Sequence, residues 1–124
     1  MKTILLNVEK ETVKIIEVEN NLEAYYKALN CDLIEIFERK IGGKWFDVMC
    51  DEEGTFKEPV KISAINDMGE PMFVGNLMFF HNDGEGNLVG LENEDIEHIK
   101  HYIQKMYTRA FPKGYPMLTQ CEYR

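Results

Sequence analysis

The alternation of apolar and polar residues predicts two β-hairpins in the first half of the chain. Residues 3–8 (TILLNV) and 12–18 (TVKIIEV) are rich in β-branched residues and flank a short EKE turn, so they predict two paired strands. Residues 32–41 and 44–52 flank Gly42 and Gly43, a pair that favours a tight hairpin turn. A further run, 72–80 (MFVGNLMFF), is the most apolar in the chain and is too short for a buried helix, so we expect one central strand there.

Two segments have helical spacing. Residues 20–30 (NNLEAYYKALN) predict a short helix, with Asn20 or Asn21 as its N-cap. Residues 92–110 predict a longer helix, because apolar residues recur at steps of three and four. These are Ile96, Ile99, Ile103, Met106 and Ala110. Acids crowd its start and cations its end, as the helix dipole favours, and Pro112 is expected to stop it.

The segments between these elements predict turns and one irregular stretch. Residues 52–59 and 81–87 are expected to be a turn and a loop, and residues 60–71 an irregular segment or a short strand. The expected fold class is α+β: a largely antiparallel β-sheet packed against two α-helices, the longer one near the C-terminus. We expect residues 1–124 to form a single ligand-binding domain, with 111–124 as a C-terminal extension.

Composition supports one globular domain and gives no sign of a membrane segment. The 124 residues are 44% hydrophobic and 29% charged, which is the ordinary globular range. The N-terminus has only a three-residue apolar run, Ile4 to Leu6, and no stretch approaches the roughly 20 apolar residues that a spanning helix needs. The three cysteines are widely spaced with no CxxC pair, so reduced thiols in a cytoplasm are expected.

Charge is distributed unevenly along the chain. The net charge of −8 argues against nucleic acid as a partner, because duplex affinity depends largely on neutralising phosphates. Residues 100–124 nevertheless carry +4, whereas the first 99 residues carry −12. One interpretation of this basic region is that its cations complement the C-terminal end of a helix dipole. Another is that they bind an anionic ligand.

The expected long helix would place a possible ligand site along one flank. A helical wheel sets His98 beside Tyr102, Lys105 and Arg109, where cationic donors and an aromatic ring suit a nucleotide diphosphate. Arg109 is the strongest candidate, since its planar guanidinium fits phosphate. The predicted ligand-binding residues are Tyr102, Lys105, Arg109, Phe111, Lys113 and Tyr115, the last three folding back over the helix. Alternatively, the rings are peripheral core and the cations are dipole partners.

Catalytic and metal motifs are weak. Glu94, His98 and His101 have metal-ligand chemistry at i, i+4 and i+7, but the wheel points all three away from the apolar stripe, so we expect solvent-facing side chains and no metal. The acidic CDEEG stretch at 50–54 is expected to be a charged turn. No phosphate-binding glycine loop, GxSxG or HExxH occurs. The chain is therefore expected to be a binding protein without cofactors rather than an enzyme.

Several stretches together resemble a known group. NNLEAYYKALNCDLIEI, CDEEGTFKEP, FVGNLMFF and GLENEDIEHIKHYI are similar in order and spacing to small phage-borne proteins of unknown function, over residues 2–103. Within that group the chain resembles the phage anti-Thoeris proteins of the first-described type. It departs from many members at Asn30-Cys31, where they have Gly-Gly, and at Val60-Lys61-Ile62, where they have Asn-Arg. Lys61 keeps a positive charge there.

The resemblance implies a specific function. Such proteins are sponges: they bind and sequester a cyclic ADP-ribose isomer (1''-2' or 1''-3' glycocyclic ADP-ribose) without cleaving it, and so block Thoeris immunity. It also implies a viral protein in the host bacterial cytoplasm and a homo-oligomer of dimers assembled into a hexamer. Ligand pockets would lie between protomers, with a separate cyclic trinucleotide pocket in some members. Two alternatives stay open, an acidic DNA mimic that inhibits a host defence protein and a cyclic-nucleotide phosphodiesterase.

Overall fold

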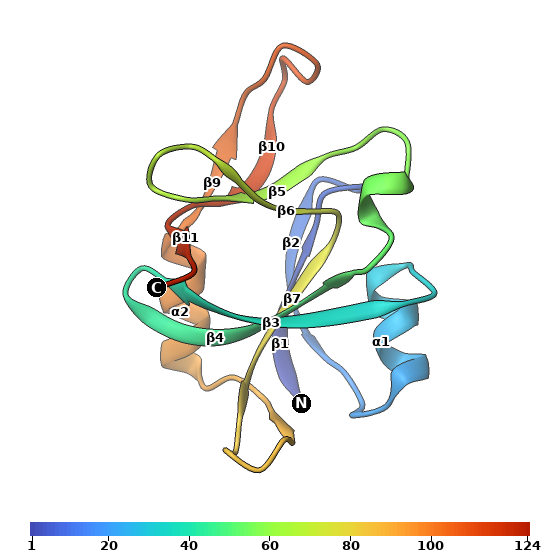
Figure 1. The fold of residues 1–124 in the computed structure, drawn as a ribbon, viewed down its shortest axis with the longest axis vertical. Helices are drawn as coiled ribbons and strands as arrows, with labels where there is room; N and C mark the ends of the chain where they lie inside the picture. Colours follow the sequence, from blue (N-terminus) through green and yellow to red (C-terminus); the bar gives the residue numbers. More distant parts are fainter.

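Two β-sheets and two short helices make up the computed structural model, which describes residues 1–124 (Figure 1). The helices are α1 (Leu22–Leu29) and α2 (Asn93–His101). The larger sheet contains β1 (Lys2–Asn7), β2 (Thr12–Glu17), β3 (Ile34–Ile41), β4 (Lys44–Asp51), β7 (Leu77–Asn82), β8 (Leu88–Val89) and β11 (Cys121–Glu122). The smaller sheet contains β5 (Ile62–Ile65), β6 (Pro71–Val74), β9 (Ile103–Met106) and β10 (Tyr115–Leu118). The predicted α+β class is confirmed.

Strand pairing in both sheets is almost entirely antiparallel. The larger sheet has the order β11-β3-β4-β7-β1-β2, with β8 paired to β7, and the smaller sheet has the order β6-β5-β10-β9. Only β5 and β10 run parallel. Both predicted hairpins are confirmed, since β1 pairs with β2 from Lys2↔Glu17 and β3 pairs with β4 through Ile41↔Lys44. The turn between β3 and β4 uses Gly42 and Gly43, both at positive φ, which suits glycine.

The predicted first helix is confirmed, together with one of its two candidate caps. The Asn21 side chain accepts a hydrogen bond from the Ala24 amide at 2.8 Å, and Asn30 ends the helix in the left-handed conformation. Tyr25 and Leu29 point into a small core against one face of the larger sheet, where they meet Met49, Met78 and Phe80.

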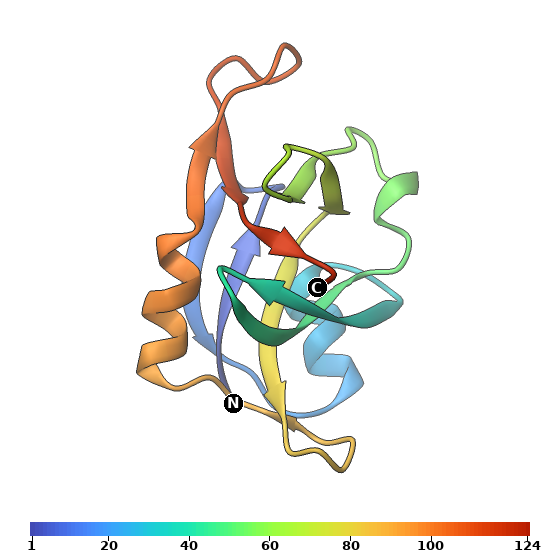
Figure 2. The ribbon, with the colours of Figure 1, turned by 60° about the vertical axis from the view of Figure 1, so that its left-hand side comes forward.

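The main core lies on the opposite face of the larger sheet. There β3, β4 and β7 pack against the smaller sheet and α2 through 18 buried residues, including Phe46, Phe79, Ile99 and Leu118. Figure 2 shows α1 and α2 on opposite sides of the larger sheet, with β9 and β10 projecting beyond its end. Neither helix is long and apolar enough to cross a membrane. All three cysteines are free.

The prediction of one central strand over residues 72–80 was wrong. The segment forms β6 in the smaller sheet and β7 in the larger one, with Gly75 and Asn76 between them. Buried Asn76 stabilises this crossing, because its Oδ1 accepts the Val8 amide at 2.9 Å and its Nδ2 donates to the Leu29 carbonyl at 3.2 Å. β7 itself is central, between β4 and β1.

The prediction of a helix over residues 92–110 was also wrong in its second half. α2 begins at a capping box formed by Glu92 and Asp95 and ends at His101. The Tyr102 carbonyl, which a continuing helix would use, instead accepts hydrogen bonds from the Thr119 amide at 2.7 Å and the Thr119 hydroxyl at 2.8 Å. β9 then pairs with β10, so tertiary pairing overrides the helical spacing, and Pro112 lies in the following loop.

The segments between these elements contain short regular elements. The turn at 52–59 contains a short 3-10 helix, η1 (Gly54–Phe56), and residues 60–71 contain β5, which confirms the short strand predicted there as one of two alternatives. β7 extends to Asn82, which shortens the predicted 81–87 loop before β8. The 111–124 segment, expected as an extension, supplies β10 to the smaller sheet and β11 to the larger one.

Candidate functional site

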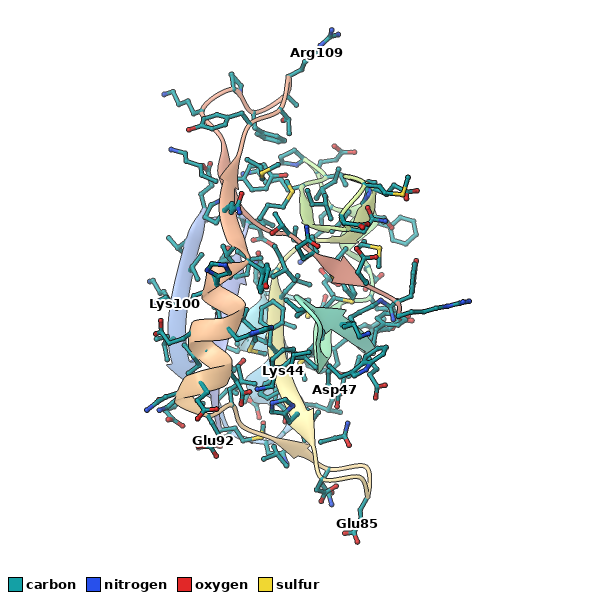
Figure 3. All side chains as sticks on the ribbon, turned by 90° about the vertical axis from the view of Figure 1, so that its left-hand side faces the viewer. Lys44, Asp47, Glu85, Glu92, Lys100 and Arg109 are labelled. Atoms are coloured by element: carbon teal, nitrogen blue, oxygen red, sulfur yellow. The ribbon has the colours of Figure 1, made fainter.

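The six sequence-predicted site residues do not share a helical flank. Tyr102 caps α2, and its ring packs against His98 at 5.3 Å and over Gly42. Lys105 is exposed on β9. Arg109 and Lys113 are exposed in the loop that joins β9 to β10, and Figure 3 shows Arg109 at its tip, pointing away from the body. The helical argument for grouping these residues is therefore wrong, and their ligand contacts stay a prediction.

Two of the predicted rings do come together, around a lysine from another element. Phe111 and Tyr115 pack edge to face, with ring centroids 5.4 Å apart. Lys61 lies over both rings, with its Nζ 4.8 Å from the centroid of Phe111 and 5.2 Å from that of Tyr115. The buried Tyr115 hydroxyl donates a 2.8 Å hydrogen bond to the Ile62 carbonyl, which fixes β5 and β10 side by side. A cation held between rings is stabilised by their π faces.

Lys61 also lines a cleft, which we define as the lysine cleft. The cleft has a volume of about 390 Å³ and is formed by the β1–β2 turn, the C-terminal end of α1 and the segment around η1. Its walls are Val8, Glu9, Asn30, Gly54, Lys57, Glu58, Pro59, Lys61 and Gly75. Its size falls in the range of about 300 to 1,000 Å³ that is common for small-molecule sites.

Lys57 is the most strongly held cation of the lysine cleft. Its Nζ lies 2.9 Å from Asp51 Oδ2 and 3.8 Å from Glu9 Oε1, and it donates a hydrogen bond to the Asn30 carbonyl. Burial alone would lower the pKa of Lys57, but the hydrogen bond and charge of Asp51 and the charge of Glu9 outweigh it and raise the pKa. Lys57 is therefore a permanent positive charge near neutral pH.

The second cation, Lys61, has a looser acidic partner. Its Nζ donates to the Val8 carbonyl at 3.1 Å and lies 3.6 Å from Glu11 Oε1. The Lys61 side chain is only 11% exposed, whereas the side chains of Glu9 and Glu11 are 40% and 48% exposed. Because these two carboxylates reach solvent, an incoming anion can replace them at the lysines at a small cost.

A second cavity, of about 550 Å³, continues from the lysine cleft and shares Asn30 and Lys57 with it. Its other walls are Tyr26, Lys27, Cys31, Asp32, Asp51 and Glu53. Burial and the charge of Asp51 raise the pKa of Cys31 to about 11, so this thiol stays protonated and is a poor nucleophile near neutral pH. The two cavities thus meet at Lys57, and acidic side chains line both of them.

A separate ionic cluster lies at the start of α2. Asp95 is buried, pairs with Lys44 and lies 3.1 Å from His81 Nε2. Burial would raise the pKa of Asp95, but hydrogen bonds from Lys44, His81 and the Glu92 amide lower it to about 2. The adjoining cavity of about 380 Å³ is lined by Lys44, Asp95, Glu92, Asn93 and Glu94. These contacts anchor α2 on the larger sheet.

The structure assembles no group of three or more His, Cys, Asp or Glu side chains suited to a metal ion. The predicted solvent-facing position of His98 was wrong. Its ring is half-buried, 5.9 Å from that of Phe46, and its Nε2 lies 2.7 Å from the Ile41 carbonyl oxygen. Glu94 and His101 are exposed, so the helical trio does not converge.

Sequence reasoning missed Lys57, Glu9 and Asn30 as possible site residues. They come from three separate segments that the fold brings together at the lysine cleft. Local signals existed only for Asn30 and Lys61, which lie where the chain departs from the group it resembles. No local pattern distinguishes Lys57 from other charged turn residues.

Comparison with known proteins identifies a family but no characterised relative. No curated protein and no solved structure matches this chain. One family model, described as a domain of unknown function, matches residues 1–107, which include both hairpins, both helices and every residue of the lysine cleft. The chain therefore belongs to the DUF3846 family.

Proposed function

We propose that this protein is a phage anti-Thoeris sponge that sequesters a glycocyclic ADP-ribose signal without cleaving it. The observation that carries the proposal is the lysine cleft, which is lined by two cations, one of which, Lys61, also lies over a pair of aromatic rings. The identity of the ligand is supported by the sequence resemblance described above. A cyclic ADP-ribose carries a diphosphate and an adenine, and the cleft offers chemistry for both.

Lys57 and Lys61 would bind the diphosphate. Glu9 lies 3.8 Å from Lys57 and Glu11 lies 3.6 Å from Lys61, and both carboxylates are exposed to solvent. A diphosphate carries two negative charges, so it competes well with two single, mobile carboxylates. Asp51, which is buried, stays with Lys57 and keeps its ammonium group oriented toward the cleft.

Phe111 would supply the apolar surface for the adenine. Phe111 is half-buried, so part of the residue reaches solvent, and the buried Tyr115 packs against its ring edge to face. Lys61 touches both rings and the cleft, which places phosphate and base contacts next to each other. Aromatic stacking of this kind adds about 0.5 to 1.5 kcal/mol beyond the area that is buried.

We further propose that the functional form is a homo-oligomer, with dimers assembled into a hexamer, and that the projecting loop completes the site of a neighbouring protomer. Lys105, Arg109 and Lys113 are exposed on this hairpin and line none of the cavities described above. In a neighbour they would add positive charge at the mouth of the lysine cleft. Tyr102 would then not contact the ligand; its role would be to position α2.

A binding and release experiment tests the function. The protein is incubated with glycocyclic ADP-ribose, separated from free ligand by filtration, heat-denatured, and the released material is identified by chromatography. We expect intact messenger in the denatured fraction. Recovery of a converted product would indicate a phosphodiesterase. Failure to retain any messenger would favour the acidic decoy, for which the net charge of −8 is the relevant feature.

The Lys61→Ala variant tests the site itself. Loss of one charge-assisted contact to the diphosphate should weaken messenger binding by about 10-fold to 100-fold. The matched control is Lys14→Ala, because Lys14 is exposed on β2 and lines none of the cavities described above. Calorimetric titration measures both affinities, and thermal unfolding confirms that each variant is folded. Unchanged affinity in folded Lys61→Ala would exclude the lysine cleft as the binding site.

A further inference from the structure

Arg39 on β3 has no acidic partner in a strongly acidic chain. The sequence contains 22 Asp and Glu residues against 14 Lys and Arg residues, yet none of the ion pairs in the structure includes Arg39. The only hydrogen bond of its side chain runs from Nη1 to the carbonyl of the preceding residue, Glu38, at 2.8 Å. Glu35 lies four residues before Arg39 on the same face of β3, but the two side chains form no ion pair. The guanidinium charge is thus not neutralised by the chain.

Two of the donor nitrogens of Arg39 are unpaired. Nε is buried and has no hydrogen-bond acceptor, and Nη2 makes no hydrogen bond although it is not buried. Nε and Nη2 lie on one edge of the guanidinium, the edge that binds carboxylates and phosphates in a two-point contact. Leaving a buried charged donor unpaired is unfavourable. The protein itself therefore provides no hydrogen-bond acceptor for these two nitrogens.

Three aromatic rings surround the guanidinium. Its carbon lies 4.5 Å from the ring centroid of Tyr123, 5.0 Å from that of Phe37 and 5.5 Å from that of Phe73. Phe37 and Phe73 also pack against each other across the two sheets, at 5.9 Å, and form a fixed wall. Rings stabilise the cation and exclude water from it, and a hydrogen bond from a dehydrated cation to an anion is stronger than one in water.

Tyr123 gives access to the unpaired edge. The residue is 64% exposed, it follows the end of β11, and its hydroxyl makes no hydrogen bond. Rotation of the ring therefore breaks no hydrogen bond, only the cation–π contact with Arg39. The neighbouring thiols of Cys50 and Cys121 add no negative charge, because burial raises the pKa of each to about 12. An anion arriving beside Tyr123 would meet an uncompensated positive charge.

We propose that Arg39, with Tyr123, Phe37 and Phe73, forms an oxyanion-binding site that takes a phosphate group on Nε and Nη2. The site shares no residue with the lysine cleft, so it does not depend on the proposed sponge function. A phosphate is favoured over a carboxylate because its second negative charge interacts with the single uncompensated cation. Inorganic phosphate and an aromatic phosphomonoester share this chemistry, and the second can also stack on Tyr123.

The chain contains only three arginines, Arg39, Arg109 and Arg124, which permits a direct test. The Nε–H resonances of the whole ¹⁵N-labelled protein are followed by NMR during titration with inorganic phosphate, phenyl phosphate or sodium acetate, at constant ionic strength. We expect the Arg39 resonance to shift saturably with both phosphates, while the exposed Arg124 responds weakly. An Arg39 shift no larger than that of Arg124, or one produced equally by acetate, would overturn the proposal.

Variants separate the guanidinium fork from simple charge. Arg39→Lys keeps the positive charge but lacks the two-point geometry, so phosphate affinity should fall by about tenfold or more. Arg124→Lys, at an exposed arginine that forms no ion pair and has no part in the lysine cleft, should leave it unchanged. If Arg39→Lys does not fold, Arg109→Lys and Arg124→Lys assign the three resonances by elimination and the wild-type titration still decides. Equal phosphate affinity in folded Arg39→Lys would contradict the two-point contact.

Discussion

Lys61 connects two parts of the molecule that are distant in the sequence. Its stem is buried and its Nζ is fixed by the Val8 carbonyl and by the rings of Phe111 and Tyr115. These three contacts hold the ammonium group at the lysine cleft whether or not Glu11 is close. A cation that is already positioned loses little conformational entropy when an anion binds, which favours affinity.

Asp95 is a second residue whose environment leads to a measurable prediction. Its folded pKa of about 2 is below the unfolded value of 3.8, so its ionised form stabilises the fold above pH 4 and this contribution is lost as the pH falls toward 2. Because the Lys44 partner is 42% exposed, solvent weakens the pair. We expect Asp95→Asn to lower the free energy of unfolding by about 1 to 2 kcal/mol at pH 7.

Urea unfolding across the pH range tests the role of Asp95. The difference between wild type and Asp95→Asn should shrink between pH 5 and about 2.5, since the wild-type carboxyl also becomes neutral. Glu94→Gln is the matched control, because Glu94 is the adjacent acid in the first turn of α2 but is exposed and has no ion pair. A difference that stays constant with pH would mean that packing, rather than charge, accounts for the loss.

At the scale of elements, the turn between β3 and β4 controls how α2 sits on the larger sheet. A Cβ added at Gly42 would overlap the ring of Tyr102, and Gly42 also has a φ of +54°. Gly42→Ala should therefore destabilise the protein by about 2 to 4 kcal/mol through displacement of Tyr102. Gly43, at φ +88°, has nothing within 4 Å of its added Cβ.

Gly43→Ala is thus the control for backbone strain in the same turn. It should cost only about 1 to 2 kcal/mol, the usual penalty for a left-handed residue with a side chain. Thermal and urea unfolding give both values. Near-ultraviolet circular dichroism should change for Gly42→Ala, because Tyr102 moves relative to His98 and His101. Equal losses in the two variants would show that the Tyr102 contact contributes nothing.

The elements that the sequence predicted well are those specified by neighbouring residues. The β-branched runs flanking residues 9–11, the Gly42-Gly43 turn and the Asn21 cap are local signals, and the two hairpins and α1 follow from them. The two errors have non-local causes. Thr119 ends the helical path at Tyr102, and buried Asn76 turns the chain from one sheet into the other. Neither contact can be inferred from the periodicity of the segment that it redirects.

In the candidate site, too, local sequence signals were predicted and non-local contacts were not. Phe111 and Tyr115 were predicted from their aromatic character, and they do lie together, but they meet Lys61 because β10 pairs with β5 and not because they follow a helix. Lys57 could not be selected in advance, since its importance depends on the distant Glu9 and on Asp51. Burial and proximity across segments are properties of the fold, and the sequence pattern carries little information about them.

At the scale of the whole molecule, residues beyond the matched family region complete both sheets. The family model ends at residue 107, whereas β10 joins β9 to β5 and β11 adds an edge to β3. Four of the core side chains come from this last segment. They are Tyr115, Met117, Leu118 and Cys121, each at most 3% exposed. The C-terminal segment is therefore a structural part of this protein and not an appendage.

A chain that ends at Tyr107 should consequently fail to fold. Full burial of an apolar side chain contributes about 1.5 to 3 kcal/mol, so losing four of them removes an amount comparable to the total stability of a small domain, about 5 to 15 kcal/mol. It also leaves β5 and β9 without the strand between them. Circular dichroism should show no cooperative thermal transition, and amide NMR signals should lose their dispersion.

Replacing residues 107–114 with Asn-Gly separates the loop from the strands. Because Met106 pairs with Tyr115, a two-residue turn joins β9 and β10 in register, and Asn-Gly suits such a hairpin. This variant loses Phe111 and the exposed cations Arg109 and Lys113 but keeps both sheets. It should unfold cooperatively yet bind messenger weakly. A chain ending at Tyr107 that melted like the wild type would mean that the first 107 residues form a complete core, and the contribution assigned to β10 would be wrong.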